Sequence, residues 1–191
     1  MAALNKNERI GAIFTKPKNK GDKLGWVAGT LSFEIVHFNH PQRSGDILVA
    51  TNLNDTKNAY GYAGTHFSTG VAGHGGSSPY ETDIRLLASG PDFRNSIRSD
   101  LPTSNVDIVP TILSLYQLPI PKTMDGRVVT EFLQTRVKPK ASATKDVIKT
   151  EVTHPWGIYK LSAEISVMNQ YRYFDFSKVE RQVFQGCGVL I

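Results

Sequence analysis

The sequence predicts an α/β fold, in which a sheet with helices carries an appended antiparallel β segment at its C-terminal end. Three observations predict it. Short runs of β-favouring, apolar residues come first, a helix with clear end signals follows near the middle, and two segments of alternating polarity come last. With 191 residues the chain has the size of one domain or slightly more, which is enough to bury a core.

Three segments in the first 50 residues have the composition of β-strands. Residues 10–14 form a short apolar run, and residues 30–37 begin with polar–apolar alternation and are rich in β-formers. Residues 46–50 are continuously apolar after the first position, which is typical of a strand that is covered on both faces. We therefore expect three strands here.

A long stretch without periodicity follows, over residues 51–78, and it is rich in Gly, Asn, Thr and Ser. A loop of this length inside a compact domain is usually a functional loop or a linker. Residues 84–89 resume an apolar, strand-like pattern, so the stretch is bracketed by strands. We expect an ordered, functional loop.

Residues 104–118 predict a helix. Ser104 offers an N-cap, Asp107 lies three residues later, and Pro110 falls in the first turn, where a missing N–H is tolerated. The helix must end near Leu118, because the prolines that follow cannot continue it. Its predicted apolar face consists of Val109, Ile112, Leu113 and Tyr116.

The C-terminal third alternates between helical and extended patterns. Residues 124–127 have turn composition, and residues 128–133 carry apolar positions that suit a second short helix. A polar connection leads to two alternating segments, residues 158–167 and 171–176, which predict an antiparallel pair of strands.

Charge and cysteine content exclude several classes of function. The net charge is +5, but the basic residues are scattered, so no nucleic-acid partner is expected. No apolar run approaches the roughly 20 residues that span a bilayer. The single Cys187 excludes a disulfide scaffold.

His74 is the histidine with the most suggestive surroundings. It lies in the segment Gly73-His74-Gly75-Gly76, where glycines let the backbone approach an ion or a phosphate closely. The segment lacks the Gly-Lys-Ser/Thr ending of a P-loop, and the chain has no Gly-x-Ser-x-Gly nucleophile motif. The alternative is a glycine-rich turn with an exposed imidazole.

Four segments in the same order resemble the C-terminal part of the alkaline phosphatase superfamily, in particular its type I phosphodiesterase/nucleotide pyrophosphatase-like branch. They are GHGGSSPYE at 73–81, LASGPDFR at 87–94, SNVDIVPTIL at 104–113 and MDGRV at 124–128. The resemblance implies an alkaline phosphatase-like α/β sandwich. Residues 1–136 would be a partial domain of that kind, and residues 137–191 would be its β-rich C-terminal extension.

The same resemblance implies a metal-dependent hydrolase of phosphate esters, such as phosphodiesters or nucleotide pyrophosphates, with two Zn²⁺ ions per complete site. His74 matches the last histidine ligand of the family, so it is the one metal-binding residue that we expect. Family members are commonly exported, which implies a periplasmic or extracellular parent protein. Sulfatases and phosphoglycerate mutases share the fold and are related alternatives.

The sequence departs from the family pattern, because the nucleophile and the Asp/His ligand pairs of the family have no counterpart in it. A catalytic zinc needs about three protein ligands, so we expect the chain alone to be inactive and to hold no zinc tightly. A site completed by a missing N-terminal half would act on a phosphate-ester substrate. The alternative is a non-catalytic remnant or protein-binding module that associates through an exposed sheet edge.

Overall fold

The computed structural model describes residues 1–57, 61, 63–65, 74–134 and 142–184. The chain divides into two compact units, each taken by itself below: unit 1 is Met1–Asp83, Val147–Ile165 and Phe174–Ile191, and unit 2 is Ile84–Asp146 and Ser166–Tyr173. The expected boundary between residues 136 and 137 lies outside the described residues and stays a prediction.

A three-stranded sheet forms the core of unit 1. Its central strand is β1 (Ile10–Thr15), which pairs in parallel with β2 (Leu31–Ser32) and antiparallel with β3 (Ile47–Thr51). The predicted strand at residues 10–14 is confirmed, and its side chains at Ala12, Ile13 and Phe14 are buried. The buried hydroxyl of Tyr159 donates to the backbone carbonyl of Gly11, at 2.9 Å.

The expectation of a strand over residues 30–37 is wrong after its first residues. The chain turns at Ser32 into the 3-10 helix η1 (Phe33–Val36). The Ser32 hydroxyl accepts a hydrogen bond from the Glu34 N–H, and His37 ends the helix with a φ of 53°. Serine side chains offer the backbone this alternative to a strand, and alternation of polarity does not reveal it.

The strand at residues 46–50 is confirmed as β3, but it is not covered on both faces. The side chains of Ile47 and Val49 are 48% and 41% exposed. The reason is position, since β3 lies at the edge of the sheet, and only Ala50 in this strand is buried. A continuously apolar run therefore does not distinguish an edge strand from a central one.

The predicted loop at residues 51–78 contains a small antiparallel pair, β4 (Leu53–Asn54) and β5 (Gly64–Thr65). Residues 58–60, 62 and 66–73 of it lie outside the described part of the chain. The loop leads into the short helix α2 (Pro79–Thr82), and the helix α1 (Ala2–Lys6) stands at the N-terminal end of unit 1.

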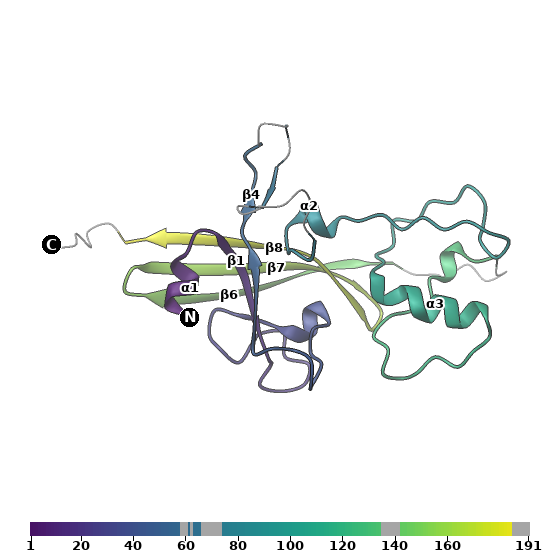
Figure 1. Ribbon diagram of the computed structural model, residues 1–191, viewed down its shortest axis with the longest axis horizontal. Helices are drawn as coiled ribbons and strands as arrows, with labels where there is room; N and C mark the ends of the chain where they lie inside the picture. The colour runs from purple at the N-terminus through teal and green to yellow at the C-terminus, as the bar shows by residue number, and fades with distance from the viewer. Residues whose placement is uncertain (58–60, 62, 66–73, 135–141, 185–191) are drawn as a thin grey trace. The chain divides into compact units, whose positions relative to one another are not determined.

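A second three-stranded sheet has the order β6-β7-β8 (Figure 1). Its strands are β6 (Thr144–His154), β7 (Gly157–Met168) and β8 (Tyr171–Val183). Two-residue connections join neighbouring strands, which only antiparallel pairs permit. The predicted antiparallel pair is confirmed. Strand β6 was not predicted from the sequence, because most of its residues are charged or polar.

Unit 2 contains the predicted helix as a 3-10 turn, η2 (Asn105–Asp107), that continues into α3 (Ile108–Leu115). The expected buried face is wrong, because Tyr116 is 74% exposed and Val109 and Ile112 are also exposed. The helix buries Pro110 and Thr111 instead.

Two further expectations concern segments of unit 2. Residues 84–89 form no strand, and Leu87 within them is 91% exposed. The second short helix exists as a 3-10 turn, η3 (Thr130–Phe132). Within the described residues, none of the helices combines the length and the apolar character that crossing a lipid bilayer requires.

Candidate functional site

His74 lies exposed at the start of a turn, residues 74–78, which we call the His74 turn. Gly75 adopts a φ of 79°, a left-handed conformation that glycine reaches without steric cost. The turn leads directly into α2. An exposed imidazole on a glycine-rich turn agrees with the alternative interpretation of His74, and the role of metal ligand stays a prediction.

Two serines fix the C-terminal side of the His74 turn. The buried hydroxyls of Ser77 and Ser177 lie 2.7 Å apart, and the Ser177 N–H donates to the Ser77 carbonyl at 2.8 Å. Ser78 then caps α2, because its hydroxyl accepts from the Tyr80 N–H at 3.2 Å. The turn is thereby anchored to β8 at one point and to the helix at the next.

The side chain of Glu81 folds back onto this turn. A Cβ atom built on Gly76 would lie 1.6 Å from Glu81 Oε2 and 2.5 Å from its Cδ, so the carboxyl group occupies the space of the absent side chain. The Oε2 atom is buried and has no hydrogen-bond partner among the described residues. Nearby, the Tyr80 hydroxyl donates to Asp55 at 3.2 Å, and this hydrogen bond raises the pKa of Tyr80.

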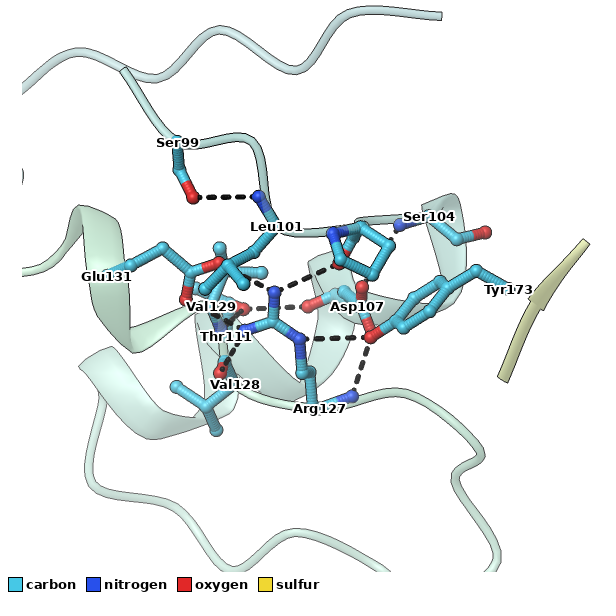
Figure 2. A network of polar contacts seen from close by, with 11 residues as sticks. Ser99, Leu101, Ser104, Asp107, Thr111, Arg127, Val128, Val129, Glu131 and Tyr173 are labelled. Atoms are coloured by element: carbon cyan, nitrogen blue, oxygen red, sulfur yellow. Dashed lines mark hydrogen bonds and ion pairs between the residues drawn. The ribbon is translucent and has the colours of Figure 1, made fainter. Parts of the chain in front are cut away.

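Unit 2 holds a buried polar cluster, the Asp107 network, shown in Figure 2. Its members are Asp107, Thr111, Arg127, Glu131 and Tyr173. The Asp107 carboxylate accepts from the backbone N–H groups of Ser104, at 3.0 Å, and Arg127, at 2.8 Å. The Thr111 hydroxyl donates to the Asp107 carbonyl at 2.7 Å. The predicted capping interaction between Ser104 and Asp107 is confirmed.

Arg127 uses all five of its N–H donors inside the protein. Two meet the oxygens of Glu131 at 2.6 and 2.8 Å, and a third meets the Tyr173 hydroxyl at 2.9 Å. The remaining two meet the carbonyls of Pro102 and Val128. Burial lowers the pKa of Arg127, but the hydrogen bond and charge of Glu131 outweigh it, so the pKa lies above its ordinary value.

Gly126 lets residues 104–113 and residues 124–128 lie against each other. A Cβ atom at this position would come within 2.0 Å of the Val106 carbonyl oxygen. The turn that precedes Arg127 therefore touches the backbone just ahead of Asp107. Because the donors of Arg127 are all occupied, the network offers no guanidinium N–H to a substrate phosphate. Its geometry suits a structural role.

A shallow depression of about 280 Å³ opens beside the network, with Glu131, Met168, Asn169 and Tyr171 among its lining residues. Both Glu131 oxygens already bind Arg127. The depression therefore presents little free charge, and we assign it no role.

The described residues do not form a zinc site by themselves. Among them, no group of three or more His, Cys, Asp or Glu side chains is placed to hold a metal ion. A catalytic zinc needs about three protein ligands. His74 is thus a single candidate ligand, at the start of the His74 turn.

Sequence reasoning missed Glu81, Arg127, Glu131, Tyr173 and Ser177. The spacing of Arg127 and Glu131, four residues apart, was a usable signal, because such pairs meet on helical turns. Ser177 and Tyr173 carried no local signal, since their partners lie 100 and 46 residues away in sequence.

Comparison with known proteins finds similarity to GPI ethanolamine phosphate transferase 2 of two organisms. The Candida albicans protein is 36% identical over 81 residues, which cover 37% of this chain and 9% of that protein. The Debaryomyces hansenii protein is 28% identical over 124 residues, which cover 57% of this chain and 14% of that protein. The chain thus spans only a small part of either relative's length.

No model of a known protein family matches the chain, and no solved structure matches it. Both relatives are phosphoester-transfer enzymes of the alkaline phosphatase-like superfamily. The similarity therefore supports the expected superfamily over part of the chain. It does not extend to hydrolysis, nucleotide pyrophosphate substrates or zinc.

Proposed function

We propose that this chain contributes the C-terminal portion of an alkaline phosphatase-like domain that transfers a phosphoester group, and that the group is ethanolamine phosphate. The observation that carries the proposal is the partial similarity to two proteins whose names state this activity. The order of four family-like segments between residues 73 and 128 supports the first part of the proposal, the alkaline phosphatase-like domain.

The proposed reaction is transfer, whereas the sequence alone favoured hydrolysis. In both reactions the P–O bond to the leaving alcohol breaks, and a P–O bond to the incoming oxygen forms. In transfer that oxygen is the hydroxyl of an acceptor, whose proton leaves with the departing alcohol. In hydrolysis it belongs to water. The choice between them depends on the acceptor, and none of the described residues has been assigned to bind it.

His74 is the residue of this chain that we assign to the reaction site, as one metal ligand. The assignment rests on the match between residues 73–81 and the family segment that carries its last histidine ligand. The contact of Ser77 with Ser177 fixes this turn on β8 and is compatible with that role. The remaining ligands and the nucleophile would come from sequence that this chain does not contain. No catalytic step is therefore assigned to the chain alone.

A chimera tests the proposal. This whole chain replaces the corresponding stretch of the Candida albicans transferase, and transfer of ethanolamine phosphate to a GPI acceptor is measured. We expect activity in the chimera. His74→Ala should reduce it by more than the roughly 10–100-fold that follows loss of an outer partner of a metal ligand. The exposed Arg98→Ala is the control and should leave activity unchanged.

The outcomes separate the candidate functions. An active chimera that keeps its activity after His74→Ala would overturn the role of His74. A folded but inactive chimera would overturn the transferase proposal and favour a non-catalytic remnant or binding module. An active chimera that releases ethanolamine phosphate to water, without transferring it, would restore the hydrolase interpretation.

A further inference from the structure

We propose that Glu81 is a positioning residue for His74, whose carboxyl group fills the space beside Gly76 and holds the His74 turn in the conformation that presents the imidazole. The inference deepens the proposed function and rests on it, since His74 is the residue that is positioned. Glu81 itself need not touch a substrate.

The Glu81 carboxyl group and a side chain at position 76 would occupy the same space. The Glu81 carboxyl group lies where any side chain at position 76 would begin. Interiors are packed closely, so a group that fills such a gap restricts the backbone around it. The Glu81 carboxyl group packs against the side of Gly76 that would otherwise be empty. This contact restricts the conformation of the peptide between Gly75 and Gly76.

Glu81 does not act as the partner of Ser78 in a capping box, which would be its simpler role. Ser78 and Glu81 have the spacing of a capping box, in which the glutamate would accept a hydrogen bond from the Ser78 N–H. Ser78 does cap α2 through its own hydroxyl. The Glu81 Oε2 atom, however, is buried against Gly76 and has no partner in the described part of the chain.

Hydrogen bonds fix the C-terminal part of the His74 turn, at Ser77 and Ser78. Ser77 is bound to Ser177 on β8, and the backbone N–H of Glu81 donates to the Ser78 carbonyl at 3.0 Å. Among the described residues, no hydrogen bond holds Gly75 or Gly76. A buried carboxyl oxygen that has no partner in this part of the structure is costly, so its placement beside Gly76 calls for an explanation.

The test uses the isolated chain and NMR, with no substrate or metal. The variants are Glu81→Ala, Glu81→Gln, Gly76→Ala and the double variant Gly76→Ala/Glu81→Ala. The readouts are the His74 imidazole signals and the backbone order parameters of Gly75 and Gly76. The imidazole signals of His40 and His154 serve as internal controls.

We expect Glu81→Ala to shift the His74 signals and to lower the backbone order parameters of Gly75 and Gly76 toward about 0.6 or below, the range of flexible backbone. Gly76→Ala should do the same, because its Cβ expels the flexible carboxyl group. The double variant should therefore match either single variant. Glu81→Gln keeps the shape and should retain the wild-type signals.

Unchanged His74 signals and unchanged order parameters of Gly75 and Gly76 in a folded Glu81→Ala variant would overturn the proposal. Additive effects in the double variant would also overturn it, because they would show that Glu81 and residue 76 do not compete for one space. Both results are independent of the chimera. Loss of transferase activity there would refute the proposed function and leave the coupling between Glu81 and the turn measurable.

Discussion

The guanidinium of Arg127 and the carboxylate of Glu131 form a buried, two-fold hydrogen-bonded ion pair, and the two side chains are only 6% and 8% exposed. Arg127 lies just before η3, and Glu131, four residues later, lies within it. Because Arg127 also binds Tyr173 and the carbonyl of Pro102, it joins three segments of unit 2. This buried ion pair is therefore part of the architecture of unit 2.

Removal of one partner of this pair should destabilise unit 2 strongly. Arg127→Met leaves the Glu131 carboxylate buried without its cation, which costs about 3–5 kcal/mol in comparable buried pairs. The double variant Arg127→Met/Glu131→Leu should lose less than the sum of the single variants, since no charge is stranded. Hydrogen exchange of the α3 amides measures the effect in this unit.

An exposed ion pair supplies the matched control. Arg98 and Asp100 lie 3.6 Å apart with side chains that are almost fully solvated. Arg98→Met should change stability by no more than about 0.5 kcal/mol. Equal effects of Arg127→Met and Arg98→Met would show that the buried network does not hold unit 2 together.

Gly126→Ala should destabilise the same unit by about 1–3 kcal/mol, the usual cost of overpacking. The new Cβ would meet the carbonyl oxygen of Val106, a backbone atom that cannot rotate away. Gly45→Ala is the control, because the nearest atom to its Cβ is 4.0 Å away. Chemical denaturation of both variants tests the difference, and similar midpoints would contradict the close approach.

Two buried tyrosines should make stability fall at alkaline pH. Burial, and then the charge of Asp107, raise the pKa of Tyr173, and burial raises that of Tyr159 despite the opposing charge of Arg181. An unfolded tyrosine ionises near pH 10. Above about pH 10 the unfolded state loses the proton and the folded state keeps it, so stability is full below this pH and declines above it.

Urea denaturation between pH 9 and about pH 12 tests this dependence. While a tyrosine is ionised only in the unfolded state, it contributes a slope of about 1.4 kcal/mol per pH unit. Tyr173→Phe and Tyr159→Phe should each flatten the alkaline decline. A decline of the same steepness in both variants and the wild-type chain would refute the role of the tyrosines.

Local patterns predicted the elements whose partners are close in sequence. The apolar run at residues 10–14 and the cap at Ser104 both form as expected. The prediction failed where a contact with a distant residue, or a contact made by a side chain, determines the backbone conformation or the exposure of an element. Ser32 bends a predicted strand into a 3-10 helix, and β3 lies at a sheet edge that its composition does not reveal.

The candidate site shows the same division. His74 was found from its glycine neighbours, which are local. The contacts that hold its turn come from Glu81, through space left by Gly76, and from Ser177 across the fold. No periodicity marks such pairs, because hydrogen bonds between distant residues follow from the tertiary structure.

The hydroxyls of Ser77 and Ser177 should be energetically coupled. Ser77→Ala leaves the buried Ser177 hydroxyl without its 2.7 Å partner, and Ser177→Ala does the reverse. Each variant should lose about 1–3 kcal/mol, the cost of an unmade buried hydrogen bond. The double variant should lose less than the sum, by about 0.5–1.5 kcal/mol, because neither hydroxyl remains unpaired. Denaturation of the four proteins gives this coupling energy.

The partly exposed Ser162, whose hydroxyl makes only a 3.5 Å contact with the Lys178 carbonyl, is the control. Ser162→Ala should show no coupling to Ser177→Ala. The backbone hydrogen bond from Ser177 to the Ser77 carbonyl survives in every variant, so the turn should loosen without detaching. Lower backbone order parameters of Gly75 and Gly76 in Ser77→Ala would then show that the serine pair and Glu81 restrain the same turn from two sides. A coupling energy of zero would mean that the hydroxyl contact does not anchor the His74 turn to β8.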